Sequence, residues 1–141
     1  MKRIFAASAL LLAMTGCMGG SKNVPLAGTI WKLSSMEGIP ATAISAEVDA
    51  FTLMFESEEK MVAGRTNCNR FFGKYEEMGS ELEFTEMGMT RMACPDMQYE
   101  DVFVKMLDEV DGFQIKGDEL TLMDDKRSLA VFRAEKPEAQ K

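Results

Sequence analysis

Three cysteines carry the most reactive side chains of this 141-residue chain, which contains no histidine. Cys17 ends a short apolar run near the N-terminus, Cys68 lies in the segment 64–73, and Cys94 precedes Pro95. Without histidine the chain lacks the commonest general base, the commonest metal ligand and every Ser-His or Cys-His nucleophile pair. We therefore expect a protein that is not an enzyme and that holds no metal or cofactor.

Polar residues around the second and third cysteines are the other candidates for a site. They are Asn67, Asn69, Arg70, Thr90 and Arg91. Such residues can form a polar ligand site, but they can equally tie loops together. Asn bonds to nearby backbone in tight turns, and Arg carries five donors. We favour the loop-tying role and keep the ligand site as the alternative.

Methionine is abundant, with 13 in the chain, and Met87, Met89, Met92 and Met97 lie close to Cys94 in sequence. Thioethers bind Cu(I), so these spacings allow a copper hypothesis. Methionine is also an adaptable filler of hydrophobic cores. We favour the second interpretation.

Residues 1–16 have the pattern of a secretory signal peptide. Two basic residues precede an apolar run of about eleven residues, which is too short to cross a bilayer. Thr15 and Gly16 lead directly into Cys17, a sequence that resembles the lipobox of bacterial lipoproteins. The resemblance implies cleavage before Cys17, a diacylglycerol on its sulfur and an acyl chain such as palmitate on the new amino group. Met14 departs from the usual leucine, and an ordinary signal peptide with an incidental cysteine is the alternative.

The segment after the signal peptide suggests where the protein is held. We expect residues 17–25 to be a lipidated cysteine and a flexible tether, because small residues dominate them. Met18 differs from the Asp that retains lipoproteins in the inner membrane of enteric bacteria. The expected location is therefore the cell envelope, at the periplasmic face of the outer membrane.

Size and charge limit the class of protein. Removal of residues 1–16 would leave 125 residues, enough for a single domain, with 14 basic and 23 acidic residues and a net charge of −9. This balance argues against nucleic-acid binding and against contact with anionic lipid over the whole surface. We expect a monomer.

Most of the chain shows the two-residue alternation of antiparallel strands. The sets predicted to share one face are Thr29, Trp31, Leu33 and Phe51, Leu53, Phe55. Strands are also predicted around Phe71–Tyr75 and 82–84, and turns at Gly79, at 116–119 and at 124–127.

One segment has the periodicity of a helix. The apolar residues of 99–110 fall at spacings of three and one, which forms a single stripe. Glu100, Asp101, Lys105, Asp108 and Glu109 are predicted to lie on the opposite, polar side. Pro95 and Asp96 would start the helix and Gly112 would stop it. Such a helix needs a sheet to cover.

Three segments together resemble the META domain family of HslJ-like lipoproteins. They are Gly28–Leu33, Gly64–Tyr75 with its Cys-Asn-Arg-Phe core, and Thr90–Pro95. The resemblance covers residues 26–134 and leaves 135–141 as a charged tail. Asn67 stands where the family has glycine. If that position requires a positive φ, asparagine is the best substitute.

The resemblance implies a mainly β fold: a small antiparallel β-barrel or half-barrel of seven to eight strands with one amphipathic helix packed across it. It also implies an association with the envelope or with stress. In an oxidising compartment Cys68 and Cys94 would form a disulfide. Two buried, reduced thiols are the alternative.

The function expected from the sequence is that of a stress-associated binding or assembly module, anchored in the membrane through Cys17 and acting on an envelope protein. A strand edge or the rim of the half-barrel would make the contact. The alternative is a carrier that holds a small apolar ligand or lipid inside the half-barrel.

Overall fold

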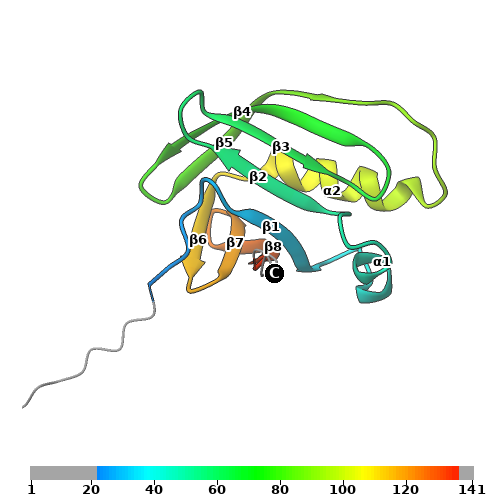
Figure 1. The fold of residues 1–141 in the computed structure, drawn as a ribbon, viewed down its shortest axis with the longest axis horizontal. Coiled ribbons are helices and arrows are strands. Elements are labelled where there is room, and N and C mark those ends of the chain that lie inside the picture. The colour runs from blue at the N-terminus through cyan, green and yellow to red at the C-terminus, as the bar shows by residue number, and fades with distance from the viewer. Residues whose placement is uncertain (1–21, 137–141) are drawn as a thin grey trace, which may run out of the picture.

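A closed, ring-like sheet of eight antiparallel strands forms the body of the protein (Figure 1). The computed structural model describes residues 22–136. Each strand pairs with its neighbours in sequence, and β8 returns to pair with β1, although β5 and β6 meet at a single residue pair. The strands are β1 (Ile30–Met36), β2 (Thr52–Glu56), β3 (Met61–Arg65), β4 (Arg70–Met78), β5 (Glu81–Met89), β6 (Gly112–Lys116), β7 (Glu119–Asp124) and β8 (Arg127–Ala134). Two helices accompany them, α1 (Ala41–Ser45) and α2 (Met97–Glu109).

Alternating side chains of the strands fill the interior of the ring. Trp31, Leu53, Phe55, Leu120 and Phe132 are fully buried, which confirms the predicted inward faces of β1 and β2. Aromatic rings meet across the centre: Phe55 and Tyr75 lie 5.0 Å apart, and Phe103 and Phe132 lie 6.2 Å apart between centroids. The described residues thus pack into a solid core, which does not favour a carrier with its ligand inside the ring.

Gly64 provides room for one of these rings. It pairs with Leu53 on β2 and with Phe71 on β4, in a row that faces inward. A Cβ atom at position 64 would lie 2.0 Å from the carbonyl oxygen of Thr52 and 2.4 Å from Cζ of Phe71. Neither neighbour can move away easily, because one is backbone and the other is a buried ring.

We expect Gly64→Ala to lower the free energy of unfolding by about 3 kcal/mol, since overpacking a filled core costs roughly 1–3 kcal/mol or more. Urea unfolding followed by circular dichroism measures this loss. Gly79→Ala is the matched control, because a Cβ there meets no atom within 4 Å although φ is +60°. Equal losses for the two variants would contradict the packing argument.

The helix α2 lies where the sequence predicts it and covers the sheet with its apolar stripe. Phe103, Met106 and Leu107 are buried, and Phe103 contacts rings on both β4 and β8. Glu100 is a correction to the prediction. It is predicted on the polar side, but it is 2% exposed, because it faces the polar turn that carries Thr66 and Asn69 rather than solvent.

The predicted turns are confirmed, whereas two elements are additions. Gly79 and Gly117 adopt positive φ in the turns that end β4 and β6. The short helix α1 and the strand β3 were not singled out from the sequence. Ile44 is buried on α1, and β3 has only two strong apolar positions, so neither produces a clear periodic pattern.

Both ends of the described chain are held against the sheet. The Asn23 side chain accepts a hydrogen bond from the Gly117 N–H, and the Val24 N–H donates to the Gly117 carbonyl, each at 2.8 Å. The chain thus enters the ring beside the β6–β7 hairpin (Figure 1). The predicted tether 17–25 is bound from Asn23 onward, and the Glu135 N–H pairs with the Ile30 carbonyl at 2.8 Å.

Some predictions fall outside the described residues. These are the signal peptide 1–16, the lipidation of Cys17 and the end of the charged tail. Within 22–136, neither helix combines the length and apolar character that crossing a bilayer would require.

Candidate functional site

Two of the five candidate polar residues, Asn69 and Thr90, meet in a cluster centred on Asn69, which is buried at the turn between β3 and β4. Asn69 is 1% exposed. Its Oδ1 accepts hydrogen bonds from the Met92 N–H at 2.7 Å and the Thr90 hydroxyl at 2.9 Å. Its Nδ2 donates to the Met92 carbonyl at 3.1 Å and to Glu100 Oε2 at 3.2 Å. One side chain therefore joins the turn, the loop after β5 and the helix α2.

Glu100 and Thr66 complete the cluster from the other side. The Thr66 hydroxyl donates to Glu100 Oε1 at 2.6 Å, and the Asn69 N–H donates to the same oxygen at 3.1 Å. Thr66 Oγ1 also accepts from the Cys68 N–H at 3.0 Å and the Asn69 N–H at 2.9 Å. The Glu100 carboxylate thus accepts three hydrogen bonds. A carboxylate can be buried only when such bonds replace those it made with water.

A disulfide lies beside this cluster. Cys68 and Cys94 are bonded, with an S–S distance of 2.02 Å and Cα atoms 5.8 Å apart. The bond links the turn that carries Asn69 to the loop that carries Met92. The structure thus uses the two cysteines as a cross-link rather than as free thiols.

The other candidate residues do not converge into a ligand site. Asn67 donates from Nδ2 to the Asp96 carbonyl at 3.1 Å, and its buried Oδ1 accepts no hydrogen bond from the described residues. It is not among the residues with positive φ, so glycine is not required there. Arg70 and Arg91 are exposed, and neither guanidinium makes a hydrogen bond with the cluster that Asn69 and Thr90 share.

Two members of the cluster were missed from the sequence, Thr66 and Glu100. Thr66 is three residues before Asn69, a spacing at which a threonine hydroxyl can hydrogen-bond to the backbone of a turn. This spacing could have identified Thr66 from the sequence. For Glu100, the spacing to Phe103 and Leu107 indicates the buried side of the helix, but its polar partners are 31 and 34 residues away and have no local signal.

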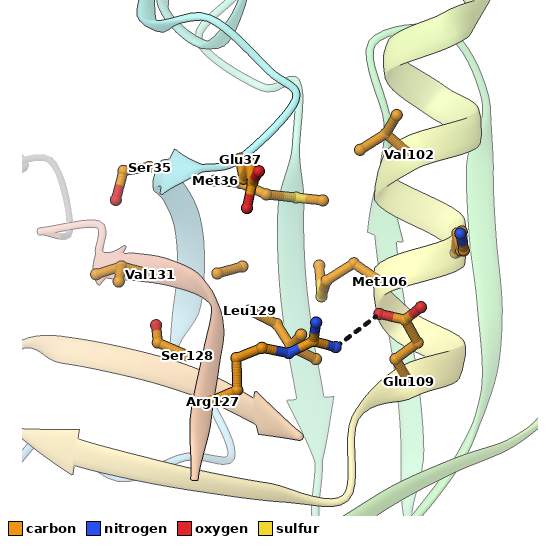
Figure 2. Close-up of a pocket in the computed structure, with 12 residues that line it drawn as sticks. Ser35, Met36, Glu37, Val102, Met106, Glu109, Arg127, Ser128, Leu129 and Val131 are labelled. Carbon is orange, nitrogen blue, oxygen red and sulfur yellow. Dashed lines mark ion pairs between the residues drawn. The ribbon is translucent and has the colours of Figure 1, made fainter. Parts of the chain in front are cut away.

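The surface has several hollows, and of the five candidate polar residues Arg70 lines one and Arg91 another. A hollow of about 490 Å³ lies between α2 and the paired ends of β1 and β8. Figure 2 shows Val102, Met106 and Met36 pointing into it and an ion pair between Arg127 and Glu109, with a nitrogen–oxygen distance of 3.7 Å.

A second hollow of about 670 Å³ borders β5 and the end of α2. Leu82, Phe84 and Val110 line it together with seven acidic residues: Glu76, Glu77, Glu81, Glu83, Asp108, Glu109 and Asp111. Nowhere in the described part of the chain do three or more Cys, Asp or Glu side chains gather in an arrangement suited to a metal ion.

An eight-stranded ring crossed by one helix, with a disulfide beside a buried Asn-Glu cluster, is the architecture of a small β domain. The chain belongs to the META domain family, whose model matches residues 24–136. This confirms the resemblance inferred from the three sequence segments.

Individual proteins support the assignment. The heat shock protein HslJ of Escherichia coli K12 is 29% identical over 142 residues, which cover 96% of this chain and 98% of HslJ. A protein from Burkholderia xenovorans solved by NMR is 26% identical, with a TM-score of 0.62 over 79% of this chain and 85% of that one. A duf4847 family protein from Bacteroides vulgatus shares the fold alone, at 16% identity and a TM-score of 0.58 over 80% of this chain and 96% of its own.

Proposed function

We propose that this protein is a non-enzymatic lipoprotein of the cell envelope, held at the periplasmic face of the outer membrane by acyl chains on Cys17. It works as a stress-associated binding or assembly module. The lipobox-like sequence before Cys17 supports the anchor. Similarity to HslJ over nearly the whole of both chains supports the association with stress.

An open strand edge is the observation that carries the binding role. β5 has nine residues and pairs with β4 along its length, but it pairs with β6 only at Glu81 and Gly112. Beyond Leu82 this edge pairs with no described strand, and α2 flanks its far end, at Met87–Met89, so the part around Glu83 has backbone groups for a further strand. The hollow beside this edge adds the half-buried apolar side chain of Phe84 for contact with a partner.

The polar signature residues support the same proposal indirectly. Asn69, Thr90 and Glu100 form their hydrogen bonds with one another and with backbone groups. Their chemistry serves the fold, so the surface is the part of the domain left to act on other molecules.

We expect intact mass spectrometry of the protein purified from membranes to show the chain from Cys17 onward plus the mass of its acyl chains. The Cys17→Ala variant should lack this mass and should leave the membrane fraction. An uncleaved chain, or a cleaved chain without added lipid, would contradict the anchor.

A photo-crosslinking residue at Glu83 tests the binding role in growing cells. Glu83 is exposed on β5 beside the open edge, and Lys126, exposed in the β7–β8 turn, is the matched control position. We expect adducts with an envelope protein from position 83 and none from position 126. Equal yields at both positions would contradict the role of this edge.

A further inference from the structure

Exposed apolar side chains form one row on the outer face of the sheet. Ile30 pairs with Met54, Met54 with Ala63, and Ala63 with Phe72, so the four lie side by side across β1 to β4. Ile30 is 46%, Met54 45% and Phe72 52% exposed. We call these four residues the outer apolar row. Scattered exposed apolar residues are common on protein surfaces. Four of them aligned in one row across neighbouring strands form a patch, which calls for a separate explanation.

Packing within the sheet explains the placement of only one member of the row, Phe72, and that only in part. A Cβ on Gly88 would lie 2.9 Å from Cε2 of Phe72, so the ring rests on the glycine of the neighbouring strand. The ring nevertheless leaves half of its surface in water. Met54 and Ile30 cover each other in the same incomplete way across β1 and β2.

Basic residues flank the row, although the protein as a whole is acidic. Lys32, Arg65 and Arg70 lie in register on one side of it, and Lys74 on the other. Arg65 pairs with Glu47 at 2.9 Å and with Asp49 at 2.7 Å.

The remaining charges bring this face close to neutrality. Lys74 pairs with Glu86 at 2.9 Å. Glu56 lies on the same side of the row as Lys74, in register with it through Met61. Arg70 makes no ion pair with any described residue. Glu135 also lies close to Lys32, so five carboxylates stand near the four cations and this face has a net charge of about −1, whereas the whole chain carries −7. The objection that overall acidity raises against contact with lipid is therefore much weaker for this face.

The position of the anchor decides what can cover the row. Four residues lie between Cys17 and Lys22, so five steps of at most about 3.6 Å each, or roughly 18 Å in all, join the two Cα atoms in a fully extended chain. The described chain then continues into Val24, which lines the same hollow as Ile30, at the end of the row. An anchored domain therefore has this end of the row within a short distance of the bilayer.

We propose that the lipid bilayer covers the outer apolar row, so that the domain lies on the membrane through the outer face of β1 to β4. This inference rests on the acyl anchor proposed above. Ile30, Met54 and Phe72 enter the boundary between headgroups and acyl chains, and Arg70 donates hydrogen bonds to lipid phosphates. A second copy of the chain fits less well, because three half-exposed side chains offer far less than the roughly 800 Å² per partner of a stable protein interface.

Fluorescence of the acylated protein in vesicles of phosphatidylethanolamine and phosphatidylglycerol tests this arrangement. The reporter variants are Phe72→Trp and Ile30→Trp, both on the row. Two variants are used so that a folding defect in one still leaves the other to report. The control is Met78→Trp, which is 76% exposed at the β4–β5 turn. Trp31 is the chain's one tryptophan and is fully buried, so it supplies a constant background.

We expect the indoles at positions 72 and 30 to shift their emission to the blue and to be quenched by lipids brominated on their acyl chains. The indole at position 78 should stay accessible to aqueous iodide. Adding Arg70→Glu to Phe72→Trp should reduce the lipid quenching severalfold, whereas Lys126→Glu should not.

The outcomes separate the two proposals. A protein that carries acyl chains and floats with vesicles, but whose indole at position 72 is quenched by iodide as fully as that at position 78, overturns the inference and leaves the anchor intact. A protein without acyl chains overturns both. A blue shift that grows with the concentration of the Cys17→Ala chain in lipid-free buffer would assign the row to a second copy and overturn the membrane contact.

Discussion

Replacing Asn69 by alanine is expected to lower the free energy of unfolding by about 4 kcal/mol, the largest effect of any single substitution in the polar cluster. The variant would leave the N–H and carbonyl of Met92, the Thr90 hydroxyl and one oxygen of Glu100 without their partner. Each buried polar group left unpaired costs roughly 1–3 kcal/mol, and water molecules that enter the vacated space relieve part of that cost. Urea unfolding followed by tryptophan fluorescence measures the difference, because Trp31 is in the core.

Asn67→Ala is the matched control for this prediction. It removes the same side chain two residues earlier, where the amide makes a single hydrogen bond to the Asp96 carbonyl. We expect a loss of about 1 kcal/mol or less. Similar losses for the two variants would show that the cluster around Asn69 does not stabilise the fold in the way its hydrogen bonds indicate.

Removing the disulfide is expected to cost about 3–4 kcal/mol. The bond joins residues 26 positions apart, and closing a loop of this length restricts the unfolded chain by about that amount in the chain-entropy model. The measurement is urea unfolding of the wild type with and without a reducing agent. The reductant should move the midpoint of the wild type to lower urea and leave that of Cys68→Ala/Cys94→Ala unchanged.

An unchanged wild-type midpoint in reductant would mean that the cross-link does not stabilise the domain. The bond and the Asn69 cluster should also be coupled, since both join the β3–β4 turn to the loop around Met92. A double-mutant cycle between Asn69→Ala and the cysteine pair should therefore give losses that do not add.

The turns, the helix α2 and every strand except β3 could be predicted from the sequence because their signals are local. Phe51, Leu53 and Phe55 alternate with residues that face outward, and their burial follows from that alternation alone. Gly79 and Gly117 mark turns because glycine adopts positive φ without strain. The stripe Phe103, Met106 and Leu107 has helical spacing, and any surface that buries it yields the same helix.

Glu100 shows where local signals end. Its charge alone suggests a place in solvent, whereas its spacing of three to Phe103 and seven to Leu107 puts it at the border of the apolar stripe. It is buried because Thr66 and Asn69 lie opposite it in the folded chain. The outer apolar row is a similar case. Ile30, Met54 and Phe72 are spread over some forty positions of sequence, and only the register of β1, β2, β3 and β4 brings them side by side.

The sequence by itself determined the family, the mainly β class, the amphipathic helix and the expectation of an anchor at Cys17, because each depends on residues that are neighbours along the chain. Only the tertiary structure decided that Cys68 is bonded to Cys94, that Asn69 and Glu100 share one buried cluster, and that β5 keeps an open edge. These features depend on distances between residues far apart in sequence. Strand register and helix packing set those distances, and neither is encoded in a short segment.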